Sequence, residues 1–158
     1  MCLCINNEAT EKFRQENSGE IEVYKLLRVG YSYNKYSIYS PYTNTCYKKG
    51  WNRAKSTSSY SLYQKIRCKF TNKRERRITG NVNGGAIHIF LNREDAEKSN
   101  KSTRAFILKG KAKVRDLVAI GEYDGFKHTG CFKKIYISEV EIDRVINSFI
   151  NGVSDYNN

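Results

Sequence analysis

Apolar and basic side chains alternate along two segments of this chain, and this alternation restricts its fold more than any other feature. Residues 104–114 and 61–70 both show a period of two, the repeat of a β-strand with one buried face. In the first segment Phe106, Leu108, Gly110, Ala112 and Val114 lie opposite Lys109, Lys111 and Lys113. In the second, Ile66, Cys68 and Phe70 lie opposite Lys65, Arg67 and Lys69. The chain therefore needs a β-sheet with a covered face.

Shorter apolar stretches supply the other strands. Together with the alternating segments, residues 20–29, 36–40, 86–91 and 131–137 predict about six strands. Within 20–29, Ile21, Val23 and Lys25 alternate with Glu22, Tyr24 and Leu26. Gly30 is expected to turn the chain, and residues 48–60 and 71–85, which are rich in Gly, Ser or Asn, are expected to form loops.

Three short helices are expected, each with its own terminal signals. The first spans about residues 7–17 with Asn7 as its cap, and the second runs from Asn92 to about Ser99. The last follows the capping-box pattern at Ser138 and stops at Gly152. Strands that are mostly adjacent in sequence favour an α+β fold: a single domain over residues 1–152, with a largely antiparallel sheet and a flexible tail at 153–158.

Positive charge is concentrated in one fifth of the chain. The 158 residues carry a formal net charge of +12. Residues 48–77 hold eleven basic side chains and a single acidic one, Glu75, within a basic Tyr/Lys/Arg-rich insertion at about 48–85. Like charges repel one another, so such a segment usually meets an acidic partner, and nucleic acid is the commonest one. A solvated loop that keeps the protein in solution is the alternative interpretation.

Aromatic side chains lie among these cations. Eight of the twelve Tyr residues fall within 31–63, together with the single Trp. Aromatic platforms beside cations are typical of proteins that bind single-stranded nucleic acid. The predicted nucleic-acid-binding residues are Lys48, Lys49, Trp51, Arg53, Lys55, Lys65, Arg67, Lys69, Lys73, Arg74, Arg76 and Arg77. A protein interface or an ordinary Tyr-rich β-surface remains open as an alternative.

The two lysine-bearing strands are interpreted differently. If the 61–70 and 104–114 segments were neighbours, their cations would form one positive sheet surface. For Lys65, Arg67 and Lys69 we expect binding, because they lie beside the predicted basic loops. For Lys109, Lys111 and Lys113 we favour protection of an exposed strand against aggregation.

Composition excludes several other classes. No apolar run is long enough to cross a bilayer, and no signal peptide is recognisable at the start. An odd number of Cys residues, five, argues for reduced thiols in the cytoplasm. We expect no membrane partner.

No residue pattern identifies a reaction. Cys2, Cys4, His128 and Cys131 could supply four zinc ligands, but free, partly buried thiols are the favoured interpretation. His88 lies between two Ile residues, where a locally satisfied histidine is commoner than a catalytic one. We therefore expect no catalytic residue, metal or cofactor, and a binding protein rather than an enzyme.

Residues 84–96, 116–121 and 131–137 resemble small phage and bacterial proteins. The shared features are a strand with Gly, His and Phe and a following helix that carries Glu-Asp-Ala, here Glu94-Asp95-Ala96. This resemblance implies a phage or mobile-element origin. For a small basic protein, it suggests an inhibitor of a nucleic-acid-handling host system of the anti-CRISPR or anti-defence type.

The chain also shows distant similarity to the ADP-ribosyltransferase fold, which implies NAD as a substrate. The nearest positions to that family's motifs are Tyr24-Lys25, Tyr39-Ser40 and the region of Gly130-Cys131. Cys131-Phe132 stand where the family has its late Glu, so no catalytic residue carries over.

Three functions follow from the sequence. The first is a small basic protein that binds RNA or DNA, or a host complex that holds them. The second is an ADP-ribosyltransferase-like enzyme, and the third is an interaction module that docks on an acidic protein surface.

Overall fold

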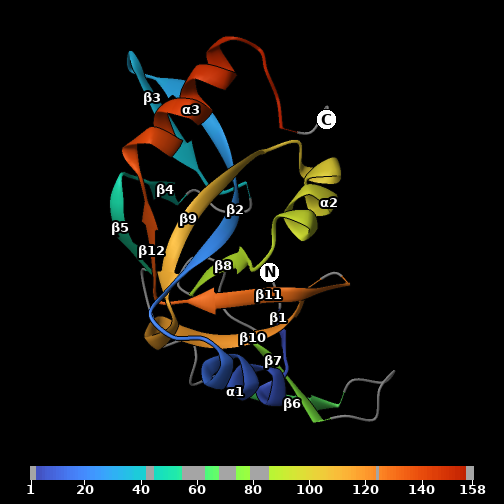
Figure 1. Cartoon of the computed structure of the whole chain (residues 1–158). Helices are drawn as coiled ribbons and strands as arrows, with labels where there is room; N and C mark the ends of the chain where they lie inside the picture. Colours follow the sequence, from blue (N-terminus) through green and yellow to red (C-terminus); the bar gives the residue numbers. More distant parts are fainter. Residues whose placement is uncertain are drawn as a thin grey trace.

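A computed structural model shows an α+β architecture with a large, mostly antiparallel sheet (Figure 1). It describes residues 3–41, 45–54, 63–67, 74–78, 86–123 and 125–155, with only the backbone at 3–5, 7, 63–67, 74–78, 102, 103, 123 and 127. Three α-helices occur in the described part, as expected: α1 (Asn7–Glu16), α2 (Arg93–Thr103) and α3 (Glu139–Ile150). A 3-10 turn, η2, covers Val114–Asp116.

The described residues form twelve strands, more than the six expected. The strands are β1 (Leu3–Ile5), β2 (Glu20–Ser32), β3 (Lys35–Tyr39), β4 (Cys46–Tyr47), β5 (Gly50–Arg53), β6 (Tyr63–Arg67), β7 (Arg74–Ile78), β8 (Ile87–Phe90), β9 (Phe106–Lys113), β10 (Leu117–Tyr123), β11 (Phe126–Phe132) and β12 (Lys134–Ile137). They are ordered β5-β12-β9-β2-β8-β11-β10-β1-β7-β6, and β3 and β4 extend from β2.

The two predicted loops contain strands. Residues 48–60 include β5, which pairs with β12, and residues 71–85 include β7, which pairs with β1 and β6. Gly and Ser had indicated irregular structure, but pairing with strands distant in sequence overrides this local preference. The predicted strand 131–137 is also divided, because Lys133 separates β11 from β12.

Gly30 does not turn the chain. It lies inside β2, and the turn falls at Tyr33 and Asn34, whose φ angles of 51° and 59° are both positive. Ser32 pairs with Lys35 across this two-residue loop, which is the geometry of a tight β-hairpin. Asn can adopt positive φ at little cost, and this explains how a turn forms without glycine.

Local capping signals place the helices accurately. Asn92 and Ser138 cap α2 and α3 by accepting hydrogen bonds from Asp95 N and Glu141 N, as expected. At α1 the cap is Asn6, not Asn7, since Asn6 Oδ1 accepts from Ala9 N at 2.9 Å. α2 is longer than expected and continues to Thr103.

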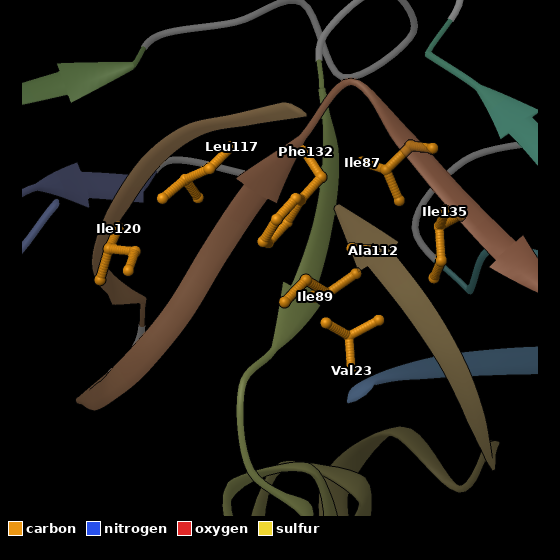
Figure 2. Packing of buried hydrophobic residues seen from close by; sticks show 8 residues of the cluster. All are labelled: Val23, Ile87, Ile89, Ala112, Leu117, Ile120, Phe132 and Ile135. Carbon is orange, nitrogen blue, oxygen red and sulfur yellow. The ribbon is translucent and has the colours of Figure 1, made fainter. Parts of the chain in front are cut away.

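Different helices cover the two faces of the sheet at β2 and β9. α3 packs Val145 against Leu27 and Leu108 on one side, and α2 packs on the other side against Leu26 and Ile107. Figure 2 shows a further core in which Phe132 points toward side chains from β8 and the strands beside it. This core contains Val23, Ile87, Ile89, Ala112, Leu117, Ile120, Phe132 and Ile135. Farther along β9, Lys109 and Lys111 are exposed.

Candidate functional site

The basic segment predicted as one binding region is divided between two ends of the sheet. Trp51 and Arg53 are on β5, the first strand of the order, and Lys48 and Lys49 precede it. The last two strands, β7 and β6, lie far from β5 (Figure 1). They carry Lys65, Arg67, Arg74, Arg76 and Arg77. Lys55, Lys69 and Lys73 lie outside the described residues.

The hairpin of β6 and β7 gathers basic positions. Lys65 pairs with Arg76, and Arg67 pairs with Arg74. Directly paired and alternate positions share a face, so these four positions lie on one side of the hairpin. The surface imagined from 61–70 next to 104–114 does not form, because β9 pairs with β2 and β12 instead.

A different cationic surface forms around Trp51. Trp51 pairs with Tyr136, and Tyr136 pairs with Lys111, so the three share one face of β5, β12 and β9. The Trp51 and Tyr136 rings meet edge to face at 5.4 Å between centroids. Lys113 Nζ lies 4.9 Å from the centroid of the Trp51 ring. We call the surface made by Trp51, Arg53, Lys109, Lys111, Lys113, Lys134 and Tyr136 the Trp51 face.

Acidic residues balance only part of this charge. On β2, Glu20 pairs with Lys113 and Glu22 pairs with Lys111. Lys109 Nζ lies 3.4 Å from Glu22 Oε2. The hydrogen bond from the Tyr24 hydroxyl, and then the charge of Lys109, lower the pKa of Glu22, which keeps it anionic. Within the described part of the chain, Arg53, Lys111 and Lys134 make no ion pair, so five cations face two carboxylates.

The Trp51 face is accessible to solvent, although Lys113, Lys134 and Tyr136 are half-buried. Trp51 is 38% exposed, and Arg53, Lys109 and Lys111 are exposed as well. The lysines of β9 were expected to protect an exposed strand against aggregation, and their pairing with Glu20 and Glu22 is compatible with that role. The same lysines nevertheless flank an aromatic pair in which Trp51 is exposed and Tyr136 is half-buried, and aromatic rings beside cations are the arrangement expected of a nucleic-acid surface.

A cavity of about 900 Å³ extends from β5 to the opposite face of β2. Side chains alternate across a sheet, and Lys25, paired with the buried Leu108, lies on the face away from Lys109 and Lys111. The cavity is lined by residues of β2, β3, β4, β5, β8 and α3, and Lys25, Tyr47 and His88 are among them. Lys48, Lys49, Trp51 and Arg53 of the predicted segment also line it, so β5 borders both the cavity and the Trp51 face.

Lys25 is buried in this cavity with little polar compensation. It is 6% exposed, and its Nζ donates to the His88 carbonyl oxygen at 2.8 Å. The same Nζ lies 5.3 Å from the centroid of the Tyr47 ring. Burial lowers the pKa of Lys25 to about 8, because a charged amine loses hydration there.

The titratable neighbours of Lys25 are neutral near pH 7. Burial raises the pKa of Cys131 to about 12 and also raises that of Tyr47. Burial, and then the charge of Lys25, lower the pKa of His88 to about 4. His88 Nε2 is buried and has no hydrogen-bond partner in the described part of the chain, so the expectation of a locally satisfied histidine is wrong for this atom.

The other candidate ligands do not gather. His128 is exposed whereas Cys131 is fully buried, and Cys2 lies outside the described residues. Across the described ranges, no group of three or more His, Cys, Asp or Glu side chains could hold a metal ion.

The site residues that were not predicted from the sequence are Lys25, Lys134 and Tyr136. For Lys25 a signal was present, because the alternation of 20–29 places it in line with Ile21 and Val23 on the apolar face. A lysine at a core position of a strand is rare unless a partner compensates its charge. Lys134 and Tyr136 acquire their place only through the pairing of β12 with β5 and β9, which no local pattern encodes.

Comparison with known proteins adds no relative, since no family model, curated protein or solved structure matches the chain. Among the described residues, no helix is both long enough and apolar enough to span a membrane.

Proposed function

We propose that this protein binds single-stranded nucleic acid, free or within a nucleoprotein complex, on the Trp51 face. The observation that carries the proposal is the Trp51–Tyr136 pair, with Lys113 Nζ 4.9 Å from the Trp51 ring centroid. An exposed ring such as that of Trp51 accepts a stacked base, which contributes about 1–3 kcal/mol, and lysines beside it contact the phosphates. The paired basic positions of β6 and β7 supply a second contact region for a longer strand or complex.

The charge distribution supports a polyanionic partner. Arg53, Lys111 and Lys134 carry no ion pair among the described side chains, so their charges are free to contact phosphates. Displacement of counterions by each contact makes the affinity dependent on salt. With about four phosphate contacts, the log–log slope of affinity against salt is expected to be about −3.

The single Trp makes a direct test possible. Titration of the wild-type protein with a fifteen-nucleotide oligo(dT) or oligo(U) at 50 mM salt is expected to quench Trp51 fluorescence to saturation. Lys111→Glu combined with Lys113→Glu is expected to weaken binding by at least about tenfold, since phosphate contacts are lost. No saturable quenching at micromolar protein would overturn the proposal.

A matched control separates the Trp51 face from general charge. Lys12→Glu combined with Lys101→Glu reverses the same number of charges on α1 and α2, where both lysines are exposed. We expect this variant to retain wild-type affinity. If it weakens binding as much as the Lys111/Lys113 variant, the net charge of the protein, and not the Trp51 face, controls the interaction.

A pull-down from host lysate distinguishes nucleic acid from a protein target. Material that disappears after nuclease treatment or at moderate salt supports nucleic-acid binding. A defined protein complex that survives both treatments, and that the Lys111/Lys113 variant fails to retain, instead identifies an inhibitor or adaptor that docks on an acidic protein surface.

A further inference from the structure

The cavity around Lys25 contains hydrogen-bond donors that the described residues leave unused. A lysine ammonium has three N–H donors. Lys25 uses one of them for the His88 carbonyl oxygen, and the Tyr47 ring lies near the charge at 5.3 Å. The remaining donors belong to a side chain that is only 6% exposed and that lines a cavity of about 900 Å³.

The charge of Lys25 also lacks a counter-ion. Buried charges in proteins are normally paired, since an unpaired one is costly to desolvate. No carboxylate of the described residues contacts Lys25, and its neighbours Cys131, Tyr47 and His88 are neutral near pH 7. An anion that enters the cavity would therefore supply the missing charge and acceptors.

The lining of the cavity is positive as a whole. Lys35, Lys48, Lys49 and Arg53 line it in addition to Lys25, whereas the acidic lining residues are Glu139 and Asp143. Glu139 is already engaged, because Lys49 Nζ lies 3.4 Å from its Oε1. Asp143 comes from α3 and is the remaining negative group that faces the cavity.

We propose that this cavity binds a phosphate monoester, with the phosphoryl group at Lys25 and the organic group against Tyr36, Ile38 and Ile142. A tetrahedral phosphate has several acceptor oxygens and matches an ammonium with unused donors better than a single-acceptor ligand does. The cavity volume lies within the range of small-molecule sites, about 300–1,000 Å³, and leaves room for an organic group beside the phosphate. Lys25 lies on the face of the sheet opposite Lys109 and Lys111, and β5, through Trp51 and Arg53, borders both the cavity and the Trp51 face. The proposal does not depend on nucleic-acid binding on the Trp51 face.

Calorimetric titration with adenosine monophosphate and with inorganic phosphate tests the proposal. We expect both to saturate at one site, with adenosine monophosphate at least tenfold tighter. Lys25→Met is expected to weaken both by tenfold or more, whereas Lys101→Met, which is exposed on α2 and outside both the cavity lining and the Trp51 face, leaves both unchanged. Absence of saturation at 10 mM of either probe, or unchanged affinity in a folded Lys25→Met variant, overturns the site. Equal affinities for the two probes overturn the assignment of the organic group.

A second measurement uses the wild-type chain alone and so does not depend on how the variant folds. Burial sets the pKa of Lys25 near 8, and a bound anion stabilises its charged form and raises this pKa. NMR of ¹⁵N-labelled lysine side chains is expected to show the Nζ signal that titrates near pH 8 moving to higher pH with adenosine monophosphate. Because this pKa rises on binding, the protein is also expected to take up protons when it binds adenosine monophosphate at pH 8.5. Calorimetry in buffers of different ionisation enthalpy measures this uptake. An unmoved titration midpoint overturns the proposal, whatever the outcome of the oligonucleotide titrations.

Discussion

Lys25 donates a hydrogen bond from Nζ to the carbonyl oxygen of His88 at 2.8 Å, and this contact joins β2 to β8 beside the cavity. The two residues also interact through charge, because the ammonium of Lys25 disfavours protonation of the His88 imidazole. Near pH 7 a neutral imidazole therefore lies beside an amine that is mostly in its charged form. Both groups lose hydration in the fold, and this cost makes the stability of the protein dependent on pH.

We predict that His88 makes the protein acid-sensitive above the range in which carboxylates titrate. The pKa of His88 falls from 6.5 in the unfolded chain to about 4 in the fold. Between these values the unfolded state binds more protons, so the free energy of unfolding decreases as the pH falls from 6.5 toward 4. The expected loss is on the order of 2–3 kcal/mol. Urea unfolding measured at pH 7.0, 6.0 and 5.0 checks this slope.

The chain offers a matched control, since its only other histidine, His128, is exposed. His88→Phe is expected to reduce the change in unfolding free energy between pH 7 and 5, whereas His128→Phe leaves this change as in the wild type. If both variants retain the full slope, another group is responsible and the desolvation of His88 is not the cause.

Local patterns predicted the elements whose signals are contained in one segment. The alternation of 104–114 corresponds to β9, in which Leu108, Gly110 and Ala112 are buried while Lys109 and Lys111 are exposed. The cap at Ser138 and the stop at Gly152 frame α3 as expected. Each of these signals depends on residues a few positions apart, so the local sequence is sufficient to predict the structure.

Features that depend on distant pairing could not be predicted. Nothing in residues 48–60 indicates that Trp51 will pair with Tyr136, because the two lie 85 positions apart in the sequence. The Trp51 face is assembled by this pairing and by that of Tyr136 with Lys111. Composition identified basic and aromatic residues as candidates, but only the strand order decides which of them share a surface.

Gly110 is predicted to be irreplaceable in β9. A Cβ atom at this position would lie 2.8 Å from the backbone oxygen of Tyr136 and 3.2 Å from the Ile135 side chain. Gly110→Ala therefore pushes β12 away from β9 at an expected cost of about 1–3 kcal/mol in unfolding free energy. Gly30→Ala is the control, because its Cβ would meet side chains alone, the edge of the Tyr39 ring at 3.0 Å and the Ser37 hydroxyl at 3.5 Å, and a side chain can move. Equal losses in the two variants would contradict this explanation.

Tyr33 is predicted to lower the stability of the hairpin between β2 and β3. Its side chain is fully exposed, and its φ of 51° is unfavourable for a bulky residue. Tyr33→Asn is expected to raise the unfolding free energy by about 0.5–1 kcal/mol, since Asn-Asn suits a turn with two positive φ angles better. Tyr33→Val, which is β-branched, should lower it. Chemical denaturation of both variants checks the prediction, and a destabilised Tyr33→Asn protein would refute it.

Asn52 is predicted to hold Trp51 in place, because its side chain bonds to Lys48 and so closes the turn that precedes β5. Its Oδ1 accepts from Lys48 N at 3.0 Å, and its Nδ2 donates to Lys48 O at 2.7 Å. Asn52→Ala removes the partners of two part-buried backbone groups of Lys48 and is expected to cost about 1–3 kcal/mol, with a red shift of the Trp51 emission. Asn100 is a matched control, since it makes the same pair of bonds to Ala105 at 2.7 and 2.6 Å and is fully buried. Asn100→Ala should lose comparable stability without changing the emission of the folded protein, because the residues it holds lie beside α2 and not beside β5. A red shift in both variants would show that the Trp51 emission responds to any loss of stability. Asn52 would then have no specific role in positioning Trp51.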